Sequence, residues 1–232
     1  MANDHDCPVP ATHHKYQEAE YFLAKVLEHY HNPWEFQFNL NAFIQAFRNI
    51  TFMLQSEPNK PAGFEDWYEK KRLEMRENRL LRNLVEARNI VVKQSSLTSK
   101  SRALAGMFRG YRMKFALQHD LPVFMPTTEA LELTKKFAIG LFLDEEHSAI
   151  GEQIGVKRTW IVDEIGESEV ASLCIEALNF MGHLIAEIHR LAGIEAEHKE
   201  LSVPMERVQI LLETDLDPTL PQKWGWECGE NA

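Results

Sequence analysis

Apolar residues recur at helical spacing in five stretches of the chain. These stretches are residues 14–31, 34–54, 64–77, 80–93 and 168–192, and each places apolar side chains three and four positions apart. Asn32-Pro33 ends the first stretch, and Gly193 follows the last at the usual position of a helix C-cap. Four predicted helices within the first 95 residues, joined by short connections, are typical of an up-and-down bundle.

The middle of the chain gives a weaker pattern. Residues 95–101 are polar and predict a linker, whereas residues 102–118 predict a basic helix. Pro122 and Pro126 then require extended or turning backbone, and Thr128 is an N-cap for a helix that ends near Gly140. The run from Thr159 to Val162 is rich in β-forming residues and predicts a small strand or hairpin.

These elements predict a mainly α fold. We expect an up-and-down helical bundle with a small irregular or β-containing segment and a long C-terminal helix. The corresponding division of the chain is a four-helix bundle at 14–95, a basic and mixed segment at 96–166, a helical part packing on the bundle at 167–215 and an irregular tail at 216–232.

Composition narrows the class of protein. The 232 residues are 44% hydrophobic and 26% charged, which is enough apolar material for a large core and excludes disorder over most of the length. No apolar run approaches the roughly 20 residues of a membrane span, and the N-terminus lacks the pattern of a secretory signal. The three cysteines are far apart and make no disulfide framework, which favours a reducing cytoplasm.

Charge is distributed unevenly along the chain. The formal net charge is -10, yet residues 69–114 contain thirteen basic and four acidic residues, a local charge of +9 that leaves -19 on the rest. This asymmetry indicates either a basic surface for an anionic partner or complementary regions that attract each other, within the fold or across a dimer.

Arg88 interrupts the apolar face of the fourth predicted helix. It shares the period of Leu84 and Val91, so its guanidinium is expected to point at the packing surface. A permanent charge there needs a partner, because burying it alone costs several kcal/mol. The partner could be a carboxylate such as Glu20 or Asp66, or an anion held in a groove between helices.

Residues 81–93, Leu-Arg-Asn-Leu-Val-Glu-Ala-Arg-Asn-Ile-Val-Val-Lys, resemble the signature helix of the HEPN superfamily. Residues 38–48 resemble the helix that commonly packs against it. The resemblance implies a homodimer with a shared cleft, and active HEPN proteins are metal-independent ribonucleases, many of them toxins of toxin-antitoxin pairs or defence factors. It makes Arg88 the phosphate-holding residue and Asn89 the polar residue beside it. The positions where the family places its histidine hold Val92, Lys93 and Gln94.

No catalytic residue is assigned, because the expected histidine is absent. A lysine at that position is normally protonated, which suits Lys93 to holding a phosphate rather than abstracting a proton. Farther along, aromatic and basic residues alternate from 108 to 115, and Arg109, Arg112 and Lys114 extend the basic region. The predicted ligand-binding residues are listed together as Arg88, Asn89, Lys93, Arg109, Arg112 and Lys114.

The sequence supports no metal site or cofactor. Glu28 with His31 and Glu195 with His198 have the spacing of di-metal carboxylate bundles, but both pairs lie at helix ends and chance accounts for them. Histidines and a cysteine also gather near the N-terminus, at His5, Cys7, His13 and His14. We expect that segment to be flexible and any metal binding there to be adventitious.

The sequence therefore predicts a cytoplasmic, homodimeric HEPN-like protein that binds RNA or another phosphate-bearing ligand, without catalysis and without a membrane partner. The first alternative is a homodimeric interaction or structural module in which Arg88 is a buried ion-pair residue. The second alternative is a metal-independent ribonuclease, which would need a general base from elsewhere in the chain.

Overall fold

The computed structural model describes residues 7–94, 97–139 and 152–223, which form two compact units. The helical unit comprises the chain up to Glu28, residues Glu35–Ser99 and residues Ile161–Val203. The sheet unit comprises His29–Trp34, Lys100–Trp160 and the chain from Pro204 onward. Each unit is thus assembled from segments that are distant in sequence.

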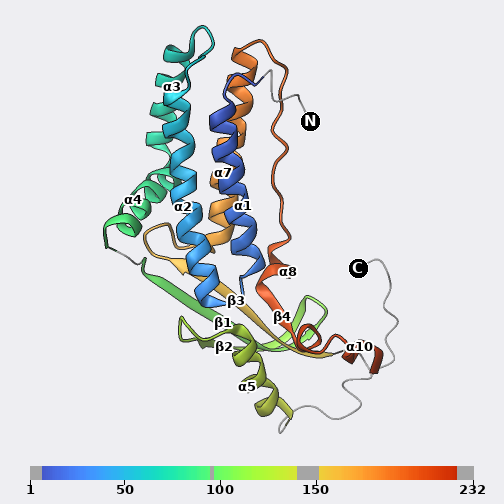
Figure 1. Cartoon of the computed structure of the whole chain (residues 1–232). Helices are drawn as coiled ribbons and strands as arrows, with labels where there is room; N and C mark the ends of the chain where they lie inside the picture. The colour runs from blue at the N-terminus through green and yellow to red at the C-terminus, as the bar shows by residue number, and fades with distance from the viewer. Residues whose placement is uncertain (1–6, 95–96, 140–151, 224–232) are drawn as a thin grey trace. The chain divides into compact units, whose positions relative to one another are not determined.

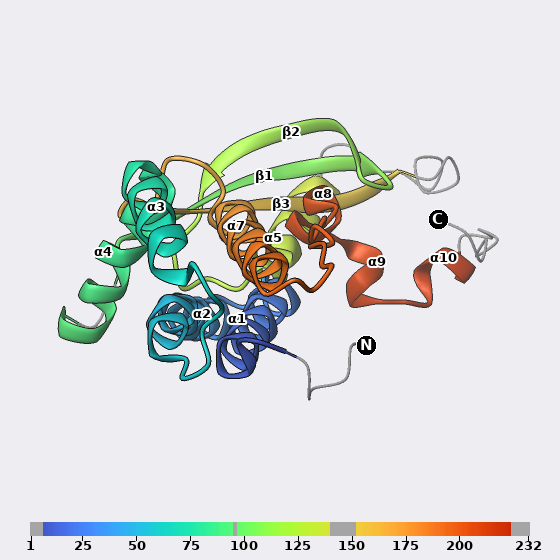
Figure 2. The same cartoon turned by 90° about the horizontal axis from the view of Figure 1, so that it is seen from above.

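The helical unit contains the five predicted helices, all of which are confirmed (Figure 1). They are α1 (Pro10–Glu28), α2 (Pro33–Ser56, whose first two residues belong to the sheet unit), α3 (Phe64–Glu77), α4 (Arg79–Gln94) and α7 (Val170–Leu191). Seen along their axes, α1 and α2 lie side by side with α7 next to them (Figure 2). One part of the core joins Leu54 of α2, Phe64 and Tyr68 of α3, and Leu184 and Ile188 of α7.

Side-chain caps define where these helices begin. Asn78 separates α3 from α4, and its Oδ1 accepts a hydrogen bond from the backbone N–H of Leu81 at 3.1 Å. The Glu169 carboxylate accepts from two backbone N–H groups in the first turn of α7. Glu57, which follows α2 and is buried, accepts from the backbone N–H and the hydroxyl of Thr12 at 2.6 and 2.8 Å. A side-chain oxygen at each of these helix starts satisfies donors that the helix leaves unpaired, from an amide at α4 and from a carboxylate at α1 and α7.

Helix α7 passes the length and hydropathy test for a membrane span. However, 56% of its most apolar window is buried inside the protein. Core helices of soluble proteins pass the same test, so α7 is weak evidence for a span.

The sheet unit is built on four strands in the order β2-β1-β3-β4. Strands β1 (Ser99–Arg109) and β2 (Arg112–Asp120) form an antiparallel hairpin, and β3 (Gln153–Val162) pairs antiparallel with the short β4 (Ile210–Leu212). Helix α5 (Thr127–Ile139) packs against the sheet through Ala130 and Leu131. Three short helices follow in the C-terminal part, α8 (Met205–Gln209), α9 (Glu213–Leu216) and α10 (Leu220–Lys223).

The prediction of a mainly α fold was wrong, because the protein is mixed α/β with a four-stranded sheet. The predicted basic helix at 102–118 is instead the β1–β2 hairpin, which turns at Gly110 and Tyr111. Gly110 has φ of 56°, a conformation that glycine adopts freely in tight hairpin turns. The short strand predicted at Thr159 to Val162 is the end of the ten-residue β3, and the helix predicted from Thr128 is α5.

The unit boundaries can be compared with the predicted division of the chain. The sheet unit begins at Lys100 rather than 96, and the chain returns to the helical unit at Ile161 rather than 167. The predicted segment 167–215 is divided, since α7 lies in the helical unit whereas residues from Pro204 onward belong to the sheet unit. The predicted tail contains α10, and residues 224–232 lie outside the described part of the chain.

Arg158 is a charged residue of the sheet unit with no exposed surface. Its guanidinium donates to the hydroxyls of Ser101 (2.8 Å) and Thr127 (3.2 Å) and to the carbonyl oxygens of Met125 (2.7 Å) and Val123 (3.0 Å). It also lies 3.9 Å from the ring centroid of Trp160. These neutral acceptors satisfy its donors without a carboxylate, and burial lowers the pKa of Arg158 to about 10.

Candidate functional site

A cleft of about 380 Å³ opens between helices of the helical unit, and four arginines line it. We call it the arginine cleft. Its basic residues are Arg48 of α2, Arg72 and Arg76 of α3, and Arg82 of α4. The remaining lining residues are Phe47, Thr51, Gln55, Tyr68, Met75, Leu81, Val85, Glu86 and Met181.

Helical periodicity brings these side chains to one place. Residues three or four apart share a helix face, and each of the three helices turns such a face to the cleft. On α2 the face carries Arg48, Thr51 and Gln55. On α3 it carries Tyr68, Arg72 and Arg76, and on α4 it carries Arg82 and Glu86. The site therefore depends on the packing of the bundle and not on a single loop.

Arg48 is the most enclosed of the four arginines. Its guanidinium donates a hydrogen bond to the hydroxyl of Thr51 and lies 4.0 Å from the ring centroid of Phe52. Burial lowers the pKa of Arg48; the charge of nearby Arg88 acts in the same direction, whereas Tyr68 opposes it. A bound anion would compensate for the lost hydration of Arg48 and offset the repulsion from Arg88.

Few carboxylates neutralise the cleft. Arg72 pairs with Glu69 at 2.8 Å on the exposed side of α3. Among the described residues, no carboxylate lies within the 4.0 Å ion-pair distance of Arg48, Arg76 or Arg82. Glu86 is the single acidic residue of the lining. Guanidinium groups gathered without acidic partners repel one another, and an oxyanion such as phosphate is a ligand that their planar forks match.

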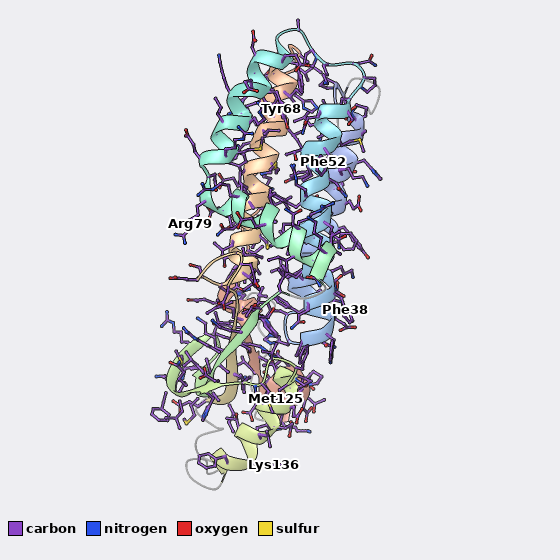
Figure 3. The ribbon with its side chains drawn as sticks, turned by 90° about the vertical axis from the view of Figure 1, so that its left-hand side faces the viewer. Phe38, Phe52, Tyr68, Arg79, Met125 and Lys136 are labelled. Atoms are coloured by element: carbon purple, nitrogen blue, oxygen red, sulfur yellow. The ribbon has the colours of Figure 1, made fainter. Side chains whose placement is uncertain are left out.

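Figure 3 shows how labelled side chains lie on the three helices. Phe52 marks α2 and Tyr68 marks α3, the two helices that supply Arg48 and the Arg72–Arg76 face. Arg79, the first residue of α4, projects away from the helices into solvent. It is absent from the cleft lining, so the bundle also offers an exposed arginine that can serve as a comparison.

The predicted residues of α4, Arg88, Asn89 and Lys93, are not buried and do not line the arginine cleft. The Arg88 side chain is half-exposed and makes a 3.4 Å contact with Asn89, and the buried residue of that turn is Ala87. Across the described residues Arg88 has no ion pair, so Glu20 and Asp66 are not its partners. Its charge contributes to lowering the pKa of Arg48, so it acts electrostatically on the cleft without lining it. Lys93 is exposed farther along α4.

Sequence reasoning identified Arg88 but missed the residues that form the cleft. Arg76 and Arg82 were counted in the basic region without being singled out. Arg48 carried a usable signal, since it interrupts the otherwise apolar and aromatic run of the second predicted helix. Which arginines lack carboxylate partners could not be read from the sequence, because the partners depend on tertiary packing.

The predicted residues of the hairpin form a separate basic site in the sheet unit. Arg109 and Arg112 face each other across the two-residue turn, and Arg207 lies 5.5 Å from the ring centroid of Tyr111. These four residues line a shallow depression of about 520 Å³. Glu152 lies 3.7 Å from Arg109 and offsets part of its charge. Lys114 is exposed. It has no paired residue on β1, because the register of the hairpin shifts at this point.

Among the residues that the structure describes, neither Glu–His pair considered for a di-metal site belongs to a group of three metal-ligating side chains. Glu28 is paired with Lys25 at the end of α1, whereas His31 belongs to the sheet unit. His198 contacts Asn179 at 3.0 Å, and Glu195 is exposed.

A different group gathers at the start of α1. The side chains of Cys7, His13 and His189 place their ligand atoms within 4.8 Å of one another. His14 is exposed, and His5 lies outside the described residues. His189 is far from Cys7 in sequence, so no local spacing pattern could have indicated this group.

The fold and the site define a mixed α/β protein whose helical unit carries an arginine-lined cleft. The sequence profile of the family described as "Bacteriophage lambda protein ea47" matches residues 1–215, so the chain belongs to this family. The chain is similar to Protein ea47 of Escherichia phage lambda, with 25% identity over 157 residues. That alignment covers 66% of this chain and 37% of the phage protein. The chain thus spans little more than a third of this curated relative. No solved structure matches the chain.

Proposed function

We propose that the protein binds RNA or another phosphate-bearing ligand in the arginine cleft, without catalysis. The observation that carries the proposal is the gathering of Arg48, Arg76 and Arg82 around one cleft, with no carboxylate in ion-pair distance among the described residues. The resemblance of residues 81–93 to the HEPN signature helix agrees with this role, since it makes Arg88 a phosphate-holding residue.

The cleft offers the chemistry that a phosphodiester requires. Arginine presents its N–H groups in a fork that matches two phosphate oxygens, and each such charge-assisted bond is stronger than a neutral one. Thr51, Gln55 and Tyr68 add neutral hydrogen-bonding groups between the guanidiniums. At about 380 Å³ the cleft is near the lower end of ligand pockets, which span about 300–1,000 Å³. We infer that it holds a phosphate with its attached sugar rather than a folded RNA.

The lining argues for binding rather than cleavage. Metal-independent RNA cleavage needs a group that removes a proton from the ribose hydroxyl, and histidine is the usual choice. The lining contains no histidine, and Lys93 occupies one of the positions where the HEPN pattern has one. Glu86 is the single carboxylate there and is exposed. We therefore place binding, in the cytoplasm and in a HEPN-like homodimer, ahead of the ribonuclease alternative.

Fluorescence anisotropy with a labelled single-stranded RNA tests the proposal. The Arg76→Ala/Arg82→Ala double variant removes two exposed guanidiniums from the cleft, so the fold should be kept. Because hydrogen bonds to charged groups contribute about 1.5–3 kcal/mol each, we expect the affinity at low salt to fall at least tenfold. The same samples, run on a denaturing gel, report cleavage.

Arg79→Ala is the matched control. Arg79 is an exposed arginine of the same helix that does not line the cleft, so its loss should change affinity much less than the double variant does. Equal losses in both variants would mean that net charge rather than the cleft binds the RNA. Cleavage by wild-type protein that is lost in the double variant would instead support the ribonuclease alternative.

The edge of the sheet favours a second candidate, a homodimeric interaction module. Strand β2 lies at one edge of the sheet, and nearly all of its residues are exposed. Met113 and Leu117 of this strand have 45% and 49% of their surface exposed. Exposed apolar edge strands are templates for pairing between chains. Light scattering on the purified chain measures its molar mass and so its oligomeric state. A monomer would argue against both the homodimeric module and the HEPN-like homodimer.

A further inference from the structure

We propose that Cys7, His13 and His189 bind a transition-metal ion, with zinc as the metal, where α1 begins and α7 ends. Cys7 precedes α1, His13 is in its first turn, and His189 is in the last turn of α7. The Cys7 Sγ lies 3.4 Å from the Nδ1 of His13 and 3.4 Å from the Nε2 of His189. The site is independent of the arginine cleft, none of whose lining residues it contains.

The distances match three corners of a zinc tetrahedron. Zinc binds thiolate sulfur at about 2.3 Å and imidazole nitrogen at about 2.0–2.1 Å, so sulfur and nitrogen ligands of one ion are separated by roughly 3.5 Å. Both sulfur–nitrogen separations in the trio are 3.4 Å. All three ligand atoms lie within 4.8 Å of one another, so little side-chain movement would complete the arrangement.

The tautomer of His189 is already that of a metal ligand. Its Nδ1 lies 2.8 Å from the carbonyl oxygen of Ile185, one turn earlier in α7. A carbonyl accepts only from an N–H, so the proton is on Nδ1 and the lone pair is on Nε2, the atom that faces Cys7. Metal-binding histidines are usually oriented in this way, by donating the other ring N–H to a carbonyl or carboxylate.

The position of the trio restrains it sterically. His189 is buried with 8% of its surface exposed, and Cys7 packs against the core cluster that contains Val9, Leu184 and Ile188. The rings of His13 and His189 meet edge to face with centroids 5.4 Å apart. Side chains held by the core lose little conformational freedom when a ligand arrives, which favours binding.

The donor set selects the class of metal. One thiolate and two imidazoles suit zinc and other borderline divalent ions such as cobalt, whereas calcium and magnesium require oxygen ligands. Binding converts the Cys7 thiol to a thiolate, and its proton is released to solvent as the sulfur–metal bond forms. A water molecule can supply the fourth ligand. The metal would join the segment before α1 to the end of α7 and so fasten two helices of the unit together.

Titration of the metal-free full chain with cobalt tests this assignment. We expect one cobalt ion per chain, strong visible d–d bands from tetrahedral coordination, and a near-ultraviolet thiolate-to-cobalt charge-transfer band. Added zinc should abolish both the d–d bands and the charge-transfer band, because it displaces the cobalt ion. Zinc should also raise the midpoint of thermal unfolding of the wild-type protein, because a ligand that binds the folded state stabilises it.

Three variants separate this site from adventitious binding. Cys7→Ser should lose the charge-transfer band and His189→Gln should weaken binding at least tenfold, while far-UV circular dichroism reports whether each remains folded. His14→Gln and Cys228→Ser are matched controls that remove an exposed neighbouring histidine and another cysteine, and both should bind like wild type. A wild-type protein without the charge-transfer band would overturn the proposal, as would a Cys7→Ser variant that retains it.

Discussion

At the scale of single residues, two arginines lie in environments that the sequence pattern did not indicate. The periodicity of residues 80–93 predicts that Arg88 faces a packed surface, yet it is half-exposed and does not line the arginine cleft. The buried arginine is Arg158, which lies between Val156 and Trp160 on the same inward face of β3. Helical periodicity groups Arg88 with the apolar residues of α4. It could not show that Ala87, and not Arg88, takes the buried position in that turn.

Arg158→Met should destabilise the protein by about 2–4 kcal/mol, because four buried or partly buried acceptors lose their donor and each such loss costs about 1–3 kcal/mol before relaxation. Urea unfolding followed by tryptophan fluorescence measures the change. Lys157→Met is the matched control, since Lys157 is the neighbouring half-exposed residue of β3, and it should change stability by less than about 1 kcal/mol. Equal effects would contradict a special role for the Arg158 network.

We expect His31 to make the stability of the protein sensitive to acid. Its Nδ1 is buried and has no hydrogen-bond partner among the described residues. Burial lowers the pKa of His31 to about 4; the charge of Arg158 acts in the same direction, and a hydrogen bond to the Val208 backbone opposes it. Between pH 6.5 and 4 the unfolded chain therefore binds more protons at this residue than the folded protein does, so stability falls as pH falls through that window.

We expect His31 to lower the free energy of unfolding by up to about 3 kcal/mol between pH 7 and pH 4. The free energy of unfolding, measured by urea at several pH values for wild type and His31→Gln, checks it. The variant removes the titrating group, so its stability should depend less on pH within this window. Parallel profiles for the two proteins would show that His31 has an ordinary pKa in the folded state.

At the scale of elements, the β1–β2 hairpin requires glycine at two positions for different reasons. A Cβ on Gly106 would lie 2.0 Å from the Phe115 carbonyl oxygen, which is rigid backbone of the paired strand. Gly110 has φ of 56° in the turn, but nothing lies within 4 Å of its Cβ position. A side chain at position 106 is therefore excluded by lack of space, whereas one at position 110 is disfavoured by the backbone conformation.

Gly106→Ala should separate the strands locally and destabilise the protein by at least about 1–3 kcal/mol, the usual range for overpacking. Gly110→Asn should change stability by less than about 1 kcal/mol, because asparagine tolerates the left-handed conformation. Urea unfolding of both variants gives the comparison. A neutral Gly106→Ala would mean that the two strands are not paired in this register.

The helices were predictable from sequence and the hairpin was not, for a physical reason. A helix buries one face at a period set by its own backbone, so residues 168–192 alone indicate α7. In the region that folds as the hairpin, apolar residues such as Phe108, Tyr111 and Phe115 fit helical spacing, and β2 is exposed along nearly its whole length. A strand without a buried face leaves little alternation to detect.

At the scale of the whole chain, the sequence shows where charged residues occur along the chain but not which of them lie close together in the fold. The region with an excess of basic residues, 69–114, supplies three of the four arginines that line the cleft, Arg72, Arg76 and Arg82. The structure divides that region, since α3 and α4 belong to the helical unit whereas β2 belongs to the sheet unit. Arg48 completes the cleft from outside the region. Contacts of this kind arise only after distant segments pack, as the Cys7–His189 contact also shows.

The central claim is that the arginine cleft binds phosphates, and the salt dependence of RNA binding tests it most directly. Each phosphate contact on a single strand contributes about -0.7 to the slope of log affinity against log salt concentration. We expect Arg76→Ala/Arg82→Ala to make the slope less negative by about 1.4 relative to wild type, and Arg79→Ala to leave it nearly unchanged. No salt-sensitive binding by the wild-type protein, or identical slopes for wild type and the double variant, would contradict the account.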